Sequence, residues 1–170
     1  MNGLSRITVV ATTLVLALAG PNSAVAKENF NTHLNGASVV PARSTQATGQ
    51  ATFLLAAGGM SLDFRVNVAN IANVTAARIH IGAPGENGLA VATLYGPEAP
   101  GGGKKTGVLT KGTITAATLE GSLAGRPLSD LIAEMQQGRA YVVITTDDGV
   151  GAPDEKPGDF SSGEIRGQIR

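Results

Sequence analysis

The chain has 170 residues, with 13 basic and 13 acidic side chains, and it contains neither cysteine nor tryptophan. The lack of cysteine excludes a disulfide framework and thiol chemistry. The balanced charge provides no basic face for nucleic acid, and an aromatic content of 4% argues against a sugar-binding cleft of stacked rings.

The first 26 residues have the pattern of a cleavable signal peptide. A short start with one positive charge, Arg6, is followed by an uncharged apolar run over residues 7–18. Ala24 and Ala26 are the small residues that a signal peptidase reads, so we expect cleavage before Lys27. A membrane anchor is the weaker alternative, because a spanning helix needs about 20 apolar residues. We therefore predict that residues 27–170 form one secreted or periplasmic domain with no membrane span after cleavage.

Most of the remaining chain has the alternating pattern of β-strands. Residues 60–68, which begin Met60-Ser61-Leu62-Asp63, place apolar side chains on one face and polar side chains on the other. With residues 51–55 and the turn at Gly58-Gly59, they predict a hairpin. Further strands are expected over residues 30–34, 74–81, 89–95, 108–115, 140–146 and 164–169.

The connections determine the predicted architecture. Segments rich in Gly, Pro, Asn and Asp separate the strands at residues 82–88, 96–103 and 147–158. Short strands with such loops indicate a sandwich or a barrel. One segment has helical spacing, with apolar residues at 128, 131, 132 and 135. We predict an all-β antiparallel Greek-key β-sandwich, immunoglobulin-like or superoxide-dismutase-like, with one short helix near residues 129–137. Ser129 or a neighbour is expected to cap its start and Gly138 its end.

Four stretches resemble the CHRD domain family, first named from chordin. They are Phe30-Asn31-Thr32-His33-Leu34-Asn35-Gly36, then Arg78-Ile79-His80-Ile81-Gly82 with its Gly-rich turn, then Gly138-Arg139-Ala140-Tyr141-Val142, and finally Gly163-Glu164-Ile165-Arg166-Gly167-Gln168. The resemblance implies an extracytoplasmic binding or interaction module without catalytic activity. In chordin-like proteins such domains occur in antagonists of secreted growth factors. Two departures concern histidines, since Arg78 and Thr145 stand where the family often has His.

Strand alternation groups a set of polar residues. Arg78 and His80 share one face of their strand, and Glu164, Arg166 and Gln168 share a face of theirs. If these strands are neighbours, five residues form one polar patch, the candidate ligand-binding site: Arg78, His80, Thr145, Glu164 and Arg166. The structural alternative is a ladder of cross-strand Arg–Glu pairs with a hydrogen-bonded histidine.

The remaining motifs favour binding over chemistry. A copper or zinc site normally needs three or four protein ligands, which His80 alone does not supply, so we predict no metal and no cofactor. His33 is expected at the surface. The acidic segment 147–155 lacks the regular spacing of a calcium loop and predicts a solvated loop. We predict a non-catalytic module for an unknown extracytoplasmic protein or small ligand. The alternative function is a metal-binding (copper or zinc) sandwich with a degenerate histidine site.

Overall fold

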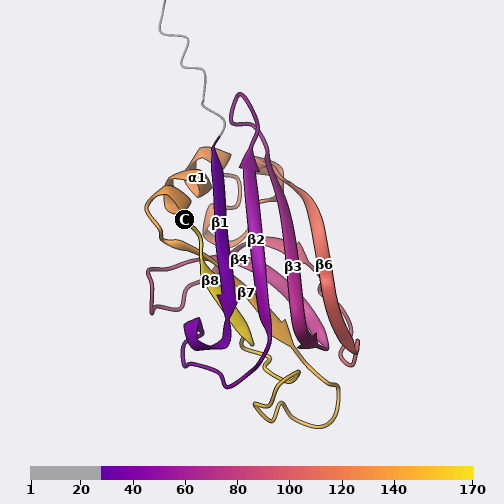
Figure 1. Ribbon diagram of the computed structural model, residues 1–170. Coiled ribbons are helices and arrows are strands. Elements are labelled where there is room, and N and C mark those ends of the chain that lie inside the picture. Colours follow the sequence, from indigo (N-terminus) through magenta and orange to yellow (C-terminus); the bar gives the residue numbers. More distant parts are fainter. Residues whose placement is uncertain (1–27) are drawn as a thin grey trace, which may run out of the picture.

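A computed structural model describes residues 28–170, so the predicted leader, residues 1–26, lies outside the described residues. The described chain is an all-β domain with one α-helix (Figure 1). Its strands are β1 (Asn29–Asn35), β2 (Thr48–Leu55), β3 (Leu62–Ala72), β4 (Val74–Ile81), β5 (Ala90–Tyr95), β6 (Lys104–Ile114), β7 (Ala140–Thr146) and β8 (Ile165–Gln168). The helix is α1 (Leu128–Gln136), and short 3₁₀ turns lie at Gly36–Ser38, Ala116–Thr118 and Gly121–Leu123.

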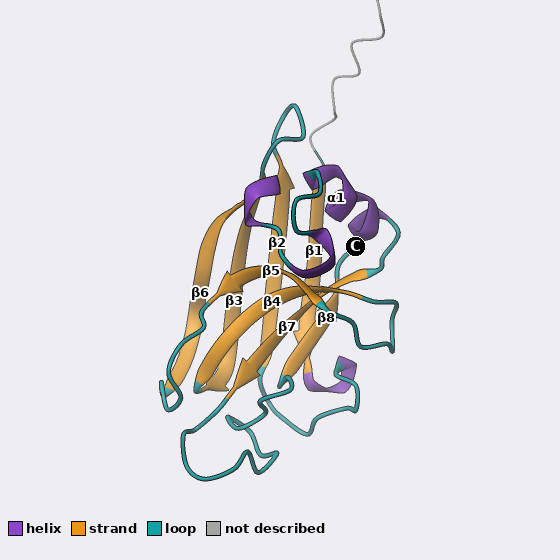
Figure 2. Ribbon diagram, turned by 180° about the vertical axis from the view of Figure 1, so that it is seen from behind, coloured by secondary structure: helices purple, strands orange, loops and turns teal. Residues whose placement is uncertain are grey.

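All eight strands belong to one antiparallel sheet with the order β5-β4-β7-β8-β1-β2-β3-β6. The sheet curves strongly, so the half formed by β5, β4, β7 and β8 crosses in front of the half formed by β1, β2, β3 and β6 (Figure 2). The pairing of Asn35 with Arg166 joins β1 to β8 and makes the two halves continuous. The predicted all-β antiparallel class is therefore confirmed, and its two facing layers are halves of a single sheet.

Closure of the sheet into a barrel depends on β5 and β6, the two outer strands of this order. These strands approach each other, and the Thr110 hydroxyl of β6 donates to the carbonyl oxygen of Leu94 in β5 at 3.2 Å. No ladder joins the two strands among the described pairings. The sheet is thus nearly barrel-shaped, and the Greek-key connection is not confirmed.

The hydrophobic core fills the space between the two halves of the sheet. The hairpin predicted at residues 51–68 forms as β2 and β3, where Leu55 pairs with Leu62 across the turn. Ile165 and Ile169 at the C-terminus are completely buried in the same core as Val66. The first and last strands consequently contribute to one core, and the closing segment of the chain is an internal part of the fold.

Helix α1 lies at one end of the sheet, as Figure 1 shows. Its buried stripe consists of the four residues predicted from the spacing, namely Leu128, Leu131, Ile132 and Met135. Gly138 follows its end with a positive φ of 65°, as expected for a helix terminator. The predicted cap by Ser129 or a neighbour is wrong, because Ser129 lies within the helix and the residue at the cap position, Pro127, gives no side-chain hydrogen bond. No helix within residues 28–170 combines the length and the apolarity that crossing a bilayer requires.

Candidate functional site

Three of the five predicted polar residues, Arg78, His80 and Arg166, lie on the outer face of three neighbouring strands, β4, β7 and β8. Two rows of paired residues cross these strands, with each row listed from β4 through β7 to β8: His80, Tyr141 and Gln168, then Arg78, Val143 and Arg166. Their neighbours in sequence, such as Ile79, Val142 and Ile165, are buried in the core. Strand alternation thus placed Arg78, His80 and Arg166 on the correct face.

The centre of this face is the ring of Tyr141, which has a partner on each strand beside it. The His80 ring stacks on it with 5.3 Å between ring centroids and 21° between ring planes. The Arg166 guanidinium lies 3.5 Å from the centroid of the same ring, a distance that allows a cation–π interaction. Only 2% of Arg166 is exposed. We call His80, Tyr141 and Arg166 the outer stack.

The outer stack and Gln168 hold the loop of residues 82–88. Arg166 donates to the Ala83 carbonyl oxygen at 3.2 Å and to the Asn87 side-chain oxygen at 3.3 Å. Gln168 donates to the Gly82 carbonyl oxygen at 2.9 Å. The loop therefore begins on two donors that project from β8.

The far end of the loop is fixed by the rings. The N–H of Gly88 donates to the Tyr141 hydroxyl at 2.7 Å, and its carbonyl oxygen lies 2.9 Å from Nδ1 of His80. Because a carbonyl oxygen only accepts, Nδ1 carries the proton in this hydrogen bond. Asn87 also contacts the connection between β1 and β2, where its side chain donates to the Val40 carbonyl oxygen at 2.8 Å. The result is a loop whose two ends are both anchored.

Arg166 carries its charge without an acidic partner. The ion pairs found within residues 28–170 involve other cations: Arg43, Arg126, Arg139 and Lys156. Burial lowers the pKa of the Arg166 guanidinium, but arginine starts from so high a value that it stays protonated at neutral pH. The Tyr141 ring and the loop carbonyls provide the stabilisation that a carboxylate would otherwise give.

Glu164 lies apart from the outer stack. Only 1% of it is exposed, and its carboxylate accepts from the Thr45 hydroxyl at 2.6 Å, the Thr146 hydroxyl at 2.8 Å and the Gly158 N–H at 2.9 Å. These are neutral donors, and no arginine contacts it in the part of the chain that the structure describes. The structural alternative of Arg–Glu pairs is therefore wrong, because Glu164 ties strands and loops together.

Thr145 also lies away from His80. It pairs with Ala76, and its hydroxyl is 2.9 Å from that of Thr75. Tyr141, which pairs with His80, is four residues earlier in β7, a separation of about 13 Å along a strand. Positions 80 and 145 consequently do not surround one point, whatever side chains they carry.

His80 should make the domain less stable in acid. Burial is the main reason that its pKa lies below the ordinary value of 6.5, since Gly88 and nearby charges contribute less. The folded state then holds a neutral ring while the unfolded chain takes up a proton, so stability is complete above about pH 6.5 and falls as the pH drops towards the folded-state pKa. We expect the melting temperature to fall between pH 7.5 and pH 5.

The variant His80→Gln keeps a donor for the Gly88 carbonyl but does not titrate, so its melting temperature should depend less on pH. The control is His33→Gln, at the exposed histidine of β1, which should retain the dependence of the native domain. Equal slopes in the native domain and in His80→Gln would contradict the role assigned to His80.

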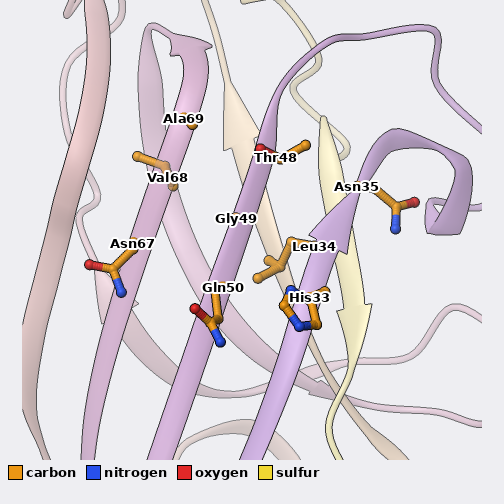
Figure 3. Close-up of a pocket in the computed structure, with 9 residues that line it drawn as sticks. All are labelled: His33, Leu34, Asn35, Thr48, Gly49, Gln50, Asn67, Val68 and Ala69. Carbon is orange, nitrogen blue, oxygen red and sulfur yellow. The ribbon is translucent and has the colours of Figure 1, made fainter.

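A second polar region lies on the other half of the sheet. A shallow groove crosses β1, β2 and β3 and has His33, Gln50 and Asn67 among its lining residues (Figure 3). His33 is exposed there, as predicted. Figure 3 shows these side chains on separate strands, and no hydrogen bond links them to one another in the described chain.

Sequence reasoning missed the central role of Tyr141 and that of Asn87. Alternation placed Tyr141 on the same face as Thr145, but nothing in the pattern showed that its ring would separate His80 from Arg166. Asn87 lies in a turn-rich segment without periodicity. Its partner Val40 is remote in the chain, so only the folded structure reveals the contact.

Comparison with known proteins identifies the family. The CHRD domain matches residues 30–152, which cover β1 to β7 and include Tyr141 and the loop of residues 82–88. No similar chain was found among curated proteins, and no similar fold among solved structures. The match extends over most of the sheet and includes three of the four motifs noted in the sequence, so the chain belongs to the CHRD domain family.

Proposed function

We propose that this protein is an exported, non-catalytic binding module that contacts an extracytoplasmic partner through residues 82–89. The observation that carries the proposal is the anchored loop on the outer face of β4, β7 and β8. Pro84, Gly85, Glu86 and Asn87 are exposed on it, and Leu89 directly after it is 74% exposed. An anchored loop with an exposed apolar side chain is suited to recognition.

Anchoring favours binding because ordering a loop at an interface costs free energy. A loop that is already fixed loses little further freedom when a partner arrives. Here the main chain of the loop forms hydrogen bonds with four side chains of the sheet, which are those of Arg166, Gln168, Tyr141 and His80. The exposed side chains above remain available for the partner.

The same contacts support binding rather than catalysis. The ring nitrogen Nδ1 of His80 is engaged by the Gly88 carbonyl, and the Arg166 guanidinium is covered by Tyr141 and the loop. These contacts direct Nδ1 of His80 and the Arg166 guanidinium at the protein's own loop. Membership of the CHRD family and the signal-like start of the sequence support the extracytoplasmic setting. The partner is a protein or a small ligand in that compartment.

The proposal predicts that Leu89→Ser abolishes capture of the partner. The domain of residues 27–170 would be immobilised and exposed to the extracytoplasmic fraction of the source cells, and the retained molecules compared between variants. The matched control is Met60→Ser, because Met60 is 79% exposed in the β2–β3 turn, outside the loop. We expect the control to retain what the native domain retains.

Two results would reject this function. One is a native domain that retains nothing specific, together with turnover of a substrate in an enzyme screen. The other is a partner that binds the native domain and Leu89→Ser equally, which would place the interface elsewhere. Melting curves of both variants confirm that each is folded before capture is compared.

A further inference from the structure

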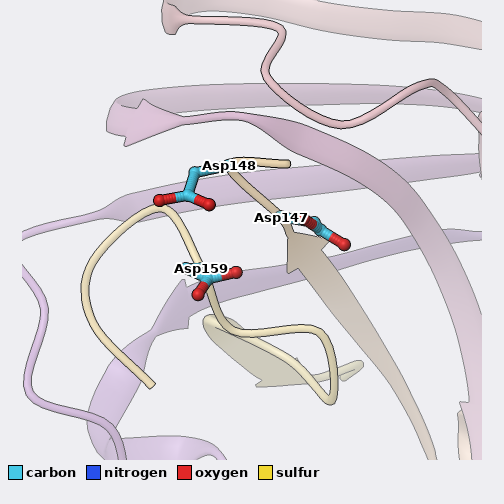
Figure 4. Close-up of side chains that lie close together, drawn as sticks. All are labelled: Asp147, Asp148 and Asp159. Atoms are coloured by element: carbon cyan, nitrogen blue, oxygen red, sulfur yellow. The ribbon is translucent and has the colours of Figure 1, made fainter. Parts of the chain in front are cut away.

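Three aspartates gather at the end of β7, away from the outer stack. Asp147 and Asp148 follow the last residue of β7, and Asp159 comes from the segment that leads to β8 (Figure 4). One carboxylate oxygen from each of them lies within 4.8 Å of the other two. The sequence predicted a solvated loop here and gave no sign that Asp159 would return to Asp147 and Asp148.

Asp159 is the residue that distinguishes this cluster from ordinary surface acids. It is only 3% exposed, and its Oδ2 accepts the N–H of Asp154. Its Oδ1 is buried and has no hydrogen-bond partner within the described chain. A buried charged oxygen without a donor is costly, and native proteins rarely leave one unsatisfied. A cation bound at Oδ1 of Asp159 would remove this cost.

The neighbouring cation is already engaged. Lys156, two residues from Asp154, forms an ion pair with the Asp154 side chain. It therefore neutralises Asp154, and three carboxylates remain to share the space at Asp147, Asp148 and Asp159.

The other two aspartates are held with one oxygen free. Asp147 accepts the N–H of Gly149 at 2.8 Å through Oδ1, and Asp148 accepts the N–H of Val150 at 2.8 Å, also through Oδ1. The main chain of Asp147 is fixed in turn, because its N–H donates to the Asn73 carbonyl oxygen at 2.9 Å. Each residue thus retains Oδ2 for a ligand.

We propose that Asp147, Asp148 and Asp159 bind a calcium ion. Calcium takes oxygen ligands at about 2.3–2.6 Å, so ligands on opposite sides of one ion are separated by up to about 4.6–5.2 Å. Magnesium ligands lie at about 2.0–2.1 Å and are at most about 4.2 Å apart. Oxygens that all lie within 4.8 Å of one another fall inside the span of a single calcium ion. Calcium also has flexible coordination, which suits ligands from the two ends of one connection, whereas magnesium demands near-ideal octahedral geometry. Water completes the coordination on the accessible side of Asp148.

The site would join the two ends of the connection between β7 and β8. Asp147 and Asp148 belong to the matched region of residues 30–152, whereas Asp159 lies beyond it. The ion would connect the end of β7 to the segment before β8. This inference is independent of the proposed binding function, because neither the loop of residues 82–88 nor Leu89 takes part.

The test is calcium binding by the domain of residues 27–170, measured by calorimetry after treatment with EDTA. We expect one equivalent of Ca²⁺ to bind with a Kd of about 10⁻⁴–10⁻³ M, as in extracellular calcium modules. At 10 mM Ca²⁺ the melting temperature should rise by about 3–8 °C. Magnesium at the same concentration should have a clearly smaller effect.

Two variants test the contributions of Asp159 and Asp148 to calcium binding separately. Asp159→Asn and Asp148→Asn should each weaken calcium binding at least about 10-fold, a typical loss for a disturbed metal site. Asp148 is accessible to solvent, so its variant should fold even if the buried replacement at 159 does not. The matched control Asp63→Asn removes one acid from β3, where its contact is the Thr113 hydroxyl, and should bind calcium like the native domain.

Any of three outcomes would overturn the proposal. The first is the absence of both calcium heat and a calcium-dependent rise in melting temperature. The second is an equal response to magnesium, which would indicate general screening of acidic charge. The third is calcium binding that survives in a folded Asp148→Asn variant with unchanged affinity.

Discussion

We expect removal of residues 163–170 to unfold the domain. This segment contains β8, which pairs with β7 on one side and with β1 on the other. Ile165 and Ile169 are fully buried in the core, and burial of each is worth about 1.5–3 kcal/mol. Since the total stability of a domain is only about 5–15 kcal/mol, this loss and the two exposed strand edges exceed what the remaining sheet can sustain. Far-UV circular dichroism should show no cooperative melting.

A shorter truncation is the control. Arg170 is exposed, and its main chain exchanges two hydrogen bonds with Asn31 at 2.8 and 3.0 Å. Its deletion should lower the melting temperature by a few degrees and leave a cooperative transition. If the truncation of residues 163–170 melted at the temperature of the native domain, the assignment of β8 to the interior of the sheet would be wrong.

The variant Gly167→Ala should lower the melting temperature by about 10 °C, because it costs about 3 kcal/mol or more. Gly167 lies in β8 opposite Val142. A Cβ at this position would overlap the His33 carbonyl oxygen and the Thr32 hydroxyl of β1. The clash is partly with main chain, so a rotation of one side chain does not relieve it, and β8 has to move away from β1.

Gly102→Ala provides a matched comparison for thermal melting. A Cβ at Gly102 meets nothing within 4 Å, and this glycine is not among those with a positive φ. Its replacement should change stability by less than about 0.5 kcal/mol. Equal melting temperatures for the two variants would show that β1 and β8 are less closely paired than the structure indicates.

The sequence was sufficient for features that depend on periodicity. Strands β4 and β7 have the predicted bounds, since their inward positions are almost all apolar. The beginning of β6 was missed, because its first residues, Lys104, Lys105 and Thr106, are polar and follow three glycines without alternation. That segment becomes a strand through its pairing with Ile71 and Ala72 of β3, which is a tertiary effect.

For the candidate site, the sequence predicted the face on which each side chain lies but not the residues that it contacts. Period-two alternation placed Arg166 and Glu164 opposite the core, yet both are buried by other parts of the chain. The loop 82–88 covers Arg166, whereas Thr45 and Gly158 enclose Glu164. A strand pattern assigns a side chain to a face of the sheet but contains no information about loops that fold over that face. The burial of Asp159 likewise could not be predicted from a strand pattern, because this residue lies in the connection between β7 and β8.

The pairing of Asn35 with Arg166 has a consequence for the timing of folding. It connects β1 with β8, so the two halves of the sheet cannot join in this way until Arg166 has been synthesised. Such distant contacts slow folding, because the intervening chain must first be brought into a closed loop. We therefore expect an emerging chain that still lacks β8 to remain unfolded during its synthesis.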